Sequence, residues 1–128
     1  MLMEAQVAAT IPTKDIKKAR DFYEDKLKLT ADREMSDGSV LYRCGEGTAF
    51  TVFPSSGASD GSYTQLGFWV RDVEAEVRDL RSRGVVFEEY DMPGFKTVDS
   101  VASVGDWKGA WFRDPDGNLI SIGEGPAL

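Results

Sequence analysis

The sequence contains no histidine, a single cysteine and no long apolar run, and each absence excludes a class of protein. Without histidine the chain has no Ser/His or Cys/His nucleophile pair. The lone cysteine, Cys44, cannot form an internal disulfide, which predicts a protein of the reducing cytoplasm. No apolar stretch approaches the roughly 20 residues that a membrane span requires. The first residues also lack the basic and apolar regions of a secretory signal.

Basic charge is scarce as well. The chain carries 15 Lys and Arg against 22 Asp and Glu, a net charge of −7. Its two densest basic stretches, residues 14–20 and 78–83, are interleaved with acidic and apolar residues, as on the solvated faces of amphipathic helices. Phosphate binding needs a basic face, so the sequence predicts no nucleic-acid partner and no membrane partner. The acidic excess favours solubility and is compatible with a cationic ligand.

The pattern of the remaining residues repeats once along the 128-residue chain. A strand at 6–12, a helix capped by Thr13 or Asp15, and strands at 30–35, 40–44 and 48–53 precede a Gly/Ser-rich stretch. The same order then begins again. The elements expected in this second half are a strand at 63–70, a helix from Asp72, a strand at 85–90, an irregular stretch at 91–106 whose residues 98–104 are strand-like, and a hairpin of 108–113 and 119–124. We expect one domain over 1–128, with module 1 at about 5–54, a linker at 55–62 and module 2 at about 63–125.

Equivalent positions in the two halves are separated by nearly constant numbers of residues. Helix starts Asp15 and Asp72 differ by 57 positions, and the last strands match at an offset of 70, with Phe50 on Ile120. The 13 extra residues (70 minus 57) fall in the second half, within residues 92–106. The sequence therefore predicts an α+β fold of two tandem βαβββ modules. Neither half alone can bury its sheet, so each needs the other half or a second chain.

Three segments carry a resemblance to a known family: residues 112–120 (Phe-Arg-Asp-Pro-Asp-Gly-Asn-Leu-Ile), residues 13–27 and residues 66–73. Together they resemble the vicinal oxygen chelate superfamily, which includes glyoxalase I, extradiol dioxygenases, fosfomycin-resistance enzymes and bleomycin-resistance proteins. The resemblance implies the glyoxalase/bleomycin-resistance-like fold, in which a curved mixed sheet encloses a cavity. It also implies a homodimer.

Strand alternation predicts which side chains face that cavity. It places six candidate ligand-binding residues on the cavity side: Thr10, Thr51, Phe53, Gln65, Trp69 and Ser121. Three further candidates, Phe95, Trp107 and Trp111, lie on strands or loops that could line or cap the cavity, and aromatic rings bind planar or cationic ligands. The alternative for the rings is a place in the core or a dimer interface, and it is evenly balanced for Trp107 and Trp111. Tyr42 and Tyr63 lie where they could also line the cavity, and residues 92–96 are interpreted as a mobile lid.

The enzymes of the resembled family hold a divalent metal at four positions, which map here to Ala8, Thr51, Gln65 and Ser121. One amide and two hydroxyls do not retain a divalent ion against water, so we expect neither a metal nor another cofactor. Glu124 lies three residues beyond Ser121, and alternation places it on the opposite face. We assign no catalytic residue.

Three hypotheses follow for the function. The first is a metal-independent binding protein that sequesters an aromatic or amphipathic small molecule, as antibiotic-sequestering members of the superfamily do. The second is a lyase, isomerase or oxygenase that acts on a small metabolite. The third is an interaction module with a vestigial cavity. The sequence names no ligand, and it leaves open whether the modules pair within one chain or swap between chains.

Overall fold

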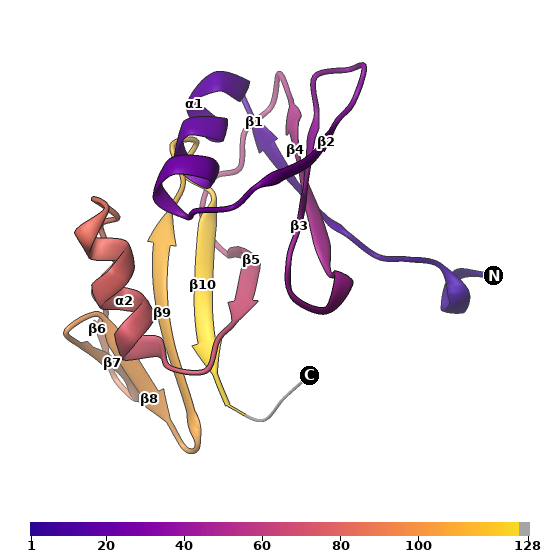
Figure 1. Cartoon of the computed structure of the whole chain (residues 1–128). Coiled ribbons are helices and arrows are strands. Elements are labelled where there is room, and N and C mark those ends of the chain that lie inside the picture. Colours follow the sequence, from indigo (N-terminus) through magenta and orange to yellow (C-terminus); the bar gives the residue numbers. More distant parts are fainter. Residues whose placement is uncertain (126–128) are drawn as a thin grey trace. The chain divides into compact units, whose positions relative to one another are not determined.

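The computed structural model describes residues 1–125 and divides the chain into two compact units, one over residues 1–59 and one from residue 60 onward (Figure 1). Within the first unit the helices and strands follow the predicted βαβββ order. They are η1 (Leu2–Glu4), β1 (Ala9–Thr13), α1 (Ile16–Arg20), η2 (Asp21–Lys26), β2 (Ala31–Glu34), β3 (Val40–Arg43), η3 (Gly45–Gly47) and β4 (Ala49–Pro54). The first strand begins at Ala9, three residues later than expected, because residues 5–8 make no ladder.

The sheet of the first unit has the order β1-β4-β3-β2, in which β1 runs parallel to β4 and the other neighbours are antiparallel. Asp15 caps α1, since its Oδ1 accepts hydrogen bonds from the backbone N–H of Lys17 at 3.1 Å and of Lys18 at 3.2 Å. The helix then widens into the π-helix η2, which buries Phe22 and Tyr23. A single helical stripe therefore covers one face of this sheet.

Aromatic rings fill the space between this helix and the sheet of the first unit. Tyr23 and Tyr42 are fully buried and Phe50 is nearly so, and the ring centroids of Tyr42 and Phe50 lie 5.3 Å apart in a stacked arrangement. The Tyr42 hydroxyl donates to Glu24 Oε2 at 2.9 Å, and Arg20 Nε donates to the same oxygen at 2.7 Å. Burial and the Glu24 carboxylate raise the pKa of Tyr42, so the phenol stays neutral.

The second unit repeats the order and extends it. Its described elements are β5 (Thr64–Trp69), α2 (Val73–Ser82), β6 (Asp91–Met92), β7 (Phe95–Val98), β8 (Val101–Val104), β9 (Trp107–Arg113) and β10 (Leu119–Glu124). The sheet order is β5-β10-β9-β8-β7-β6, so its first four strands correspond to β1-β4-β3-β2 of the first unit. The additional residues expected at 92–106 form the extra strands at the β6 edge. The predicted α+β class with two related sheets is confirmed.

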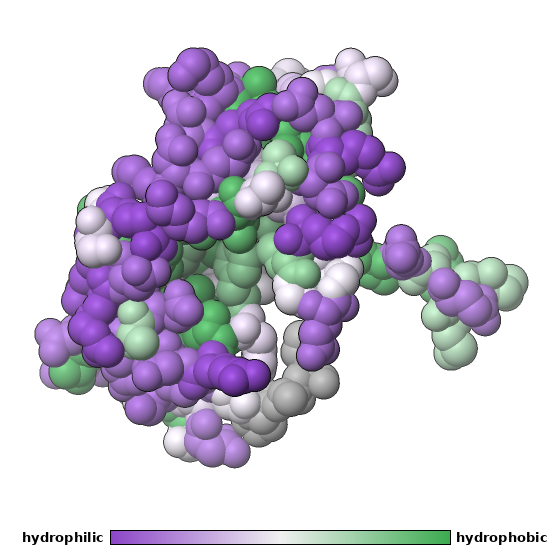
Figure 2. Space-filling model, viewed as in Figure 1, coloured by the Kyte–Doolittle hydropathy of each residue, from purple (hydrophilic) through white to green (hydrophobic). Residues whose placement is uncertain are grey.

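Helix α2 covers one face of the second sheet. Asp72 caps it by accepting from Ala75 N at 3.0 Å, and its stripe of Val73, Val77 and Leu80 is buried as predicted. The outer surface over α2 is mainly hydrophilic (Figure 2), as expected for an amphipathic helix. Ala110 and Phe112 of β9 and Ile120 and Ile122 of β10 are buried on the sheet face that α2 covers.

The closing turn of the family-like motif is built on one carboxylate. Asp114 Oδ1 accepts from the backbone N–H of Asp116 and of Asn118, both at 2.9 Å, and Asp114 Oδ2 accepts from Asn118 Nδ2 at 2.8 Å. Both Asp114 and Asn118 are buried, and Gly117 takes the positive φ of +81° that the turn needs. This turn fixes the register of β9 against β10.

Two sequence-based predictions in the second unit are wrong. Residues 85–90 form only a single bridge, Phe87 to Phe112, because their other donors go elsewhere: Val85 N bonds the helix end at Leu80 O, and Tyr90 N bonds the side chain of Thr97. Residues 91–106 are strands rather than an irregular stretch, since β6, β7 and β8 occupy them, and β8 confirms the strand-like character expected within 98–104. Short strands with alternating small and polar residues gave too little hydrophobic periodicity to predict them.

The segment before β1 carries several exposed apolar side chains, since Met1, Leu2, Met3 and Val7 are each about nine-tenths exposed or more. Among the described residues, no helix has the length and apolar character to cross a bilayer.

Candidate functional site

The face of the second sheet that lies opposite α2 collects most of the predicted site residues. Alternation along β9 turns Trp107, Gly109 and Trp111 away from the helix-side residues Ala110 and Phe112. The ladder then places residues of β10 and β5 beside them, with Ser121 between Trp111 and Gly67, and Gly123 between Gly109 and Trp69. We call this surface the non-helical face, defined by Gln65, Gly67, Trp69, Trp107, Gly109, Trp111, Ser121 and Gly123.

Glycines let the Trp107 indole lie against this face. A Cβ on Gly109 would come within 2.8 Å of Trp107 Cζ2, and one on Gly123 would come within 3.3 Å of Trp107 Nε1. A third glycine, Gly125, has Trp107 Cδ1 3.0 Å from the same position. Any side chain at these positions would push the indole away from the strands, so the glycines fix its place.

Four half-buried rings meet on the non-helical face, and we call them the aromatic cluster: Tyr90, Phe95, Trp107 and Trp111. Trp111 is at its centre, with ring centroids 5.4 Å from Phe95, 5.7 Å from Tyr90 and 5.9 Å from Trp107. Tyr90 and Phe95 also contact each other at 5.8 Å. The interplanar angles of these pairs, 53° to 79°, are those of edge-to-face and tilted packing, which is favourable between aromatic rings.

A β-bulge brings a hydroxyl to the edge of this cluster. Leu119 pairs with Thr64 and Ile120 with Leu66, so Thr64 and Gln65 together oppose one residue of β10. Trp111 Nε1 donates to Thr64 Oγ1 at 3.3 Å, which places both side chains on the non-helical face. Simple alternation would have put Thr64 on the helix side, and the sequence carries no clear sign of the bulge.

The remaining predicted residues of the second unit lie on the same face at different depths. Trp69 is 47% exposed at the end of β5. The Gln65 side-chain oxygen is covered and accepts no hydrogen bond within the described part of the chain. Ser121 Oγ lies 3.0 Å from the position of a Cβ on Gly67, so Gly67 leaves room for that hydroxyl.

The predicted residues of the first unit share a face of their own sheet. Thr10 pairs with Thr51, and Pro12 pairs with Phe53, on the side opposite the buried Ile11 and Val52. This face has two hydroxyls and one ring. Tyr42, which the sequence offered as a possible lining residue, is instead fully buried under the helix of this unit, because it pairs with the core residue Phe50 in the ladder.

The metal positions implied by the family do not fit a divalent cation. Ala8 precedes β1 and offers no side-chain donor, while Thr51, Gln65 and Ser121 supply only neutral oxygen or amide groups. Divalent ions in proteins are held by carboxylates, imidazoles or thiolates. The chemistry of these four residues therefore gives no site for the family's metal.

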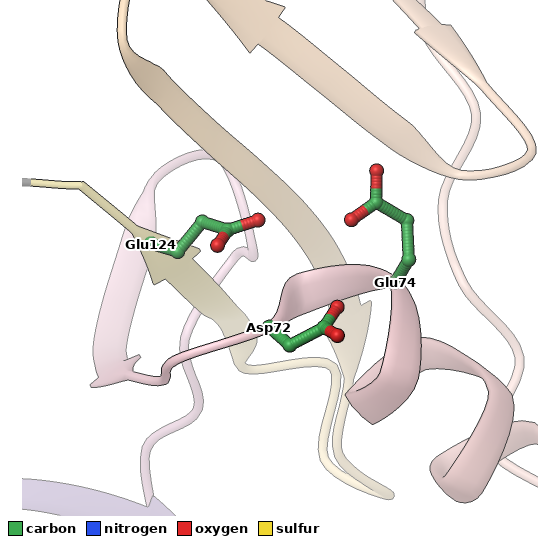
Figure 3. Close-up of side chains that lie close together, drawn as sticks. All are labelled: Asp72, Glu74 and Glu124. Atoms are coloured by element: carbon green, nitrogen blue, oxygen red, sulfur yellow. The ribbon is translucent and has the colours of Figure 1, made fainter.

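Three carboxylates do converge elsewhere in the second unit, at the start of α2 (Figure 3). Each has a partner: Asp72 accepts from Ala75 N, Glu124 Oε1 from Val73 N at 3.4 Å, and Glu74 from Lys108 Nζ at 3.0 Å. Acidic groups at a helix N-terminus are stabilised by its dipole. Glu124 lies on the helix side, as alternation predicts, and the group acts as a helix cap with an ion pair.

A recess of about 610 Å³ lies on the helix side as well, between α2 and strands β7 and β8. Its lining mixes charges of both signs with valines, and the residues are Glu74, Val77, Arg78, Arg81, Lys96, Val98, Asp99, Val101 and Ser103. No predicted site residue belongs to it. The recess and the aromatic cluster occupy opposite sides of the same sheet.

Sequence reasoning missed Tyr90, which belongs to the aromatic cluster. The signal was present: residues 93–94 are Pro-Gly, and a hairpin over 90–97 puts Tyr90 opposite Thr97, two residues from Phe95 on the same face. Burial raises the pKa of Tyr90. Tyr63, by contrast, is 60% exposed and makes no ring contact with the cluster.

The fold and this face define a class of small α+β proteins built from two βαβββ modules. The sequence matches the model of the Glyoxalase/Bleomycin resistance protein/Dioxygenase superfamily over residues 5–122, and the chain belongs to that superfamily, as its motifs predicted. Comparison with curated proteins found no match.

Solved structures agree on the fold. The antibiotic binding protein TnmS3 from Streptomyces sp. CB03234 is 25% identical with a TM-score of 0.67, over 98% of this chain and 99% of that one. UcmS2 is 20% identical with a TM-score of 0.72, over 93% and 96%. The fosfomycin resistance protein FosX from Listeria monocytogenes is 14% identical with a TM-score of 0.73, over 96% and 92%.

Proposed function

We propose that this protein binds a small aromatic or amphipathic molecule without a metal, and that the aromatic cluster on the non-helical face of the second unit holds it. The observation that carries the proposal is the clustering of four half-buried rings on the face that α2 leaves free. The site residues would be the six predicted in this unit (Gln65, Trp69, Phe95, Trp107, Trp111 and Ser121) together with Tyr90. Thr10, Thr51 and Phe53 are proposed separately as ligand-binding residues of the first unit, on the face of its sheet opposite the buried Ile11 and Val52.

The rings and polar groups of this face offer a small molecule several favourable contacts. A ring that stacks on Trp107 or Trp111 gains about 0.5–1.5 kcal/mol beyond its buried area, and a cationic ligand gains a similar amount. The Gln65 side chain is part-buried on the same face, and its amide can turn to offer a ligand a donor or an acceptor. Binding sites of small molecules typically combine such apolar walls with a few polar groups.

One of the compared structures supports the binding and sequestration of a small molecule rather than a particular enzymatic reaction. TnmS3 is described as an antibiotic binding protein, and it matches nearly the whole length of this chain at 25% identity. We infer that this protein likewise captures an aromatic small molecule and limits its free concentration.

The surroundings of the side chains most often used in acid–base or nucleophilic catalysis support a binding role for this protein rather than a catalytic one. Burial raises the pKa of the Cys44 thiol, which disfavours the nucleophilic thiolate. Glu88 pairs with Arg113 at 2.7 Å, and Glu89 accepts hydrogen bonds from Thr97 and Ser100. These carboxylates already serve the fold.

We also propose a cytoplasmic homodimer. Strands β1 and β5 each end the sheet of their own unit, and such strand edges invite pairing. Analytical ultracentrifugation of the full chain is expected to give twice the mass of 14.1 kDa. A monomer across the micromolar range would contradict the dimer and leave the binding proposal standing.

The test of binding is a titration of the chelator-treated protein with planar probes: an anthraquinone, a phenazine and an acridine. We expect tryptophan quenching and calorimetric binding in the micromolar range or tighter. Trp111→Ala should weaken binding at least about tenfold, which is roughly 1.4 kcal/mol. Tyr63→Ala, a matched removal of an exposed ring outside the cluster, should leave it unchanged. Binding that requires added Ni²⁺, Zn²⁺, Mn²⁺ or Fe²⁺ would overturn the metal-independent proposal.

A further inference from the structure

One carboxylate outside the aromatic cluster ties together the segments that carry two of its rings. Glu89 Oε1 accepts from Thr97 Oγ1 at 2.6 Å and from Ser100 N at 3.1 Å, and Glu89 Oε2 accepts from Ser100 Oγ at 2.8 Å. Glu89 comes directly before Tyr90, whereas Thr97 lies in β7 and Ser100 lies in the turn between β7 and β8. The carboxylate therefore joins the segment before β6 to the far end of β7.

The turn that Glu89 holds has an unfavourable backbone. Asp99 and Ser100 have φ values of +50° and +74°, in the left-handed region that non-glycine residues rarely adopt. Two such residues make the tight hairpin turn that usually requires Asn or Gly. Ser100 is buried, and both its N–H and its hydroxyl bond Glu89, so the carboxylate offsets the cost of this turn.

Thr97 passes this restraint on to Tyr90 and Phe95. Thr97 Oγ1 accepts from Tyr90 N at 2.8 Å, and Thr97 N donates to Tyr90 O at 2.9 Å. Phe95 lies two residues earlier on the same strand, so its side chain shares the face of Thr97. The Phe95 ring lies 5.8 Å from Tyr90 and 5.4 Å from Trp111.

Helix α2 also contacts this hydrogen-bond network directly. Arg81 donates a hydrogen bond to Ser100 Oγ, and its Nη2 lies 3.9 Å from Glu89 Oε2. The Arg81 guanidinium also lies over the Phe87 ring at 5.9 Å from its centroid. The hairpin is thus fixed to both the helix and the segment that leads to Tyr90.

We propose that Glu89 is a positioning residue of the ligand site: it holds β7 through Thr97 and Ser100 and so sets Phe95 and Tyr90 against Trp111. Glu89 itself touches no ring of the cluster in any contact described above. The proposal rests on the proposed function for its effect on affinity, and on the contacts of the ligand-free protein for its effect on the hairpin.

The first test is a double-mutant cycle with an anthraquinone probe. Glu89→Ala removes all three hydrogen bonds and should weaken binding about tenfold, whereas Glu89→Gln keeps Oε1 and should weaken it less. In a Tyr90→Ala/Phe95→Ala background Glu89→Ala should change affinity by less than about twofold, because its effect acts through those two rings. The matched control is Asp91→Ala, an exposed carboxylate two residues further along the same hairpin, which should leave affinity unchanged. Additive losses in the cycle would overturn the positioning role.

The second test needs no ligand. Amide hydrogen exchange at Thr97 and Ser100 should speed up at least about tenfold in Glu89→Ala, while exchange in β10 and the thermal midpoint change little. Equal acceleration across β10 would show a general loss of structure, and no acceleration at Thr97 would show that Glu89 does not hold the hairpin. Either result contradicts the proposal. If exchange responds as expected but no planar probe binds the wild type, the proposed function fails and the restraint on the hairpin stands.

Discussion

The two units share a strand order, but their largest groups of aromatic rings lie on opposite faces of their sheets. In the first unit Tyr23, Tyr42 and Phe50 lie between helix and sheet, where they are almost wholly buried. In the second unit Trp107 and Trp111 lie on the face that the helix does not cover, and they stay half-buried. The core of the second unit keeps one pair of rings, Phe87 and Phe112, and the two tryptophans on its other face remain available for another task.

The difference lies at the strand positions that face away from the helix, where Trp111 of β9 corresponds to Leu41 of β3. Moving a ring by one position along a strand transfers it from one face to the other. In the ladders, β9 corresponds to β3, and the helix-side places that hold Val40 and Tyr42 in the first unit hold Ala110 and Phe112 in the second. The comparison shows that the same strand order can place aromatic residues in the core, where they stabilise the fold, or on an open sheet face, where they are available to a ligand.

The largest contrast is expected from truncating one ring in each unit. Phe50→Ala removes a ring from the first core and should lower the free energy of unfolding by about 3–5 kcal/mol. Trp111→Ala should lower it by less than about 2 kcal/mol, because Trp111 is half-buried. Urea denaturation followed by circular dichroism measures both. Equal losses in the free energy of unfolding would mean that Trp111 stabilises the fold as much as Phe50 does, and would contradict the comparison.

Gly109→Ala tests whether glycine fixes the indole on the non-helical face. The new methyl group would overlap the Trp107 ring, so we expect a loss of about 1–3 kcal/mol in stability and a red shift of tryptophan emission as the indole moves into water. Gly45→Ala, where a Cβ meets nothing within 4 Å, is the control. An unchanged emission spectrum in Gly109→Ala would refute the role of the glycines.

Tyr42→Phe isolates the polar link in the first core. Losing the hydrogen bond from a buried phenol to the Glu24 carboxylate should cost about 1.5 kcal/mol. Tyr63→Phe removes the hydroxyl of an exposed ring and should stay within about 0.5 kcal/mol of the wild type. Thermal denaturation of the two variants gives the comparison, and similar losses in both would contradict it.

The smallest expected effect is on the acid side of the stability curve. Arg20 lowers the pKa of Glu24, and hydrogen bonds from Thr97 and Ser100 lower the pKa of Glu89, one carboxylate in each unit. A depressed pKa stabilises the fold above the ordinary glutamate range and loses that contribution as pH falls through the folded-state pKa. Glu24→Gln and Glu89→Gln should therefore flatten the decline in thermal midpoint below about pH 4.5. A decline as steep as in the wild type would exclude both groups as its cause.

Much of this architecture could be predicted from the sequence, for physical reasons. Asp72 with its valine stripe, and the Asp-Pro-Asp-Gly-Asn turn, are local signals whose structures depend on neighbouring residues. The aromatic cluster needed three-dimensional information. Trp107 and Trp111 could be placed on one face by counting, but the bulge at Thr64 and the Glu89 network arise from tertiary contacts that no local pattern encodes.

The most direct test of the central claim uses the three tryptophans as reporters. Their indole N–H resonances, assigned by single substitution, can be followed by NMR while a planar probe is added to the chelator-treated protein. We expect the largest shifts at Trp107 and Trp111, with the backbone N–H of Tyr23 in the first core unmoved. Shifts confined to residues outside the non-helical face, or a complete absence of shifts at saturating probe, would contradict the account.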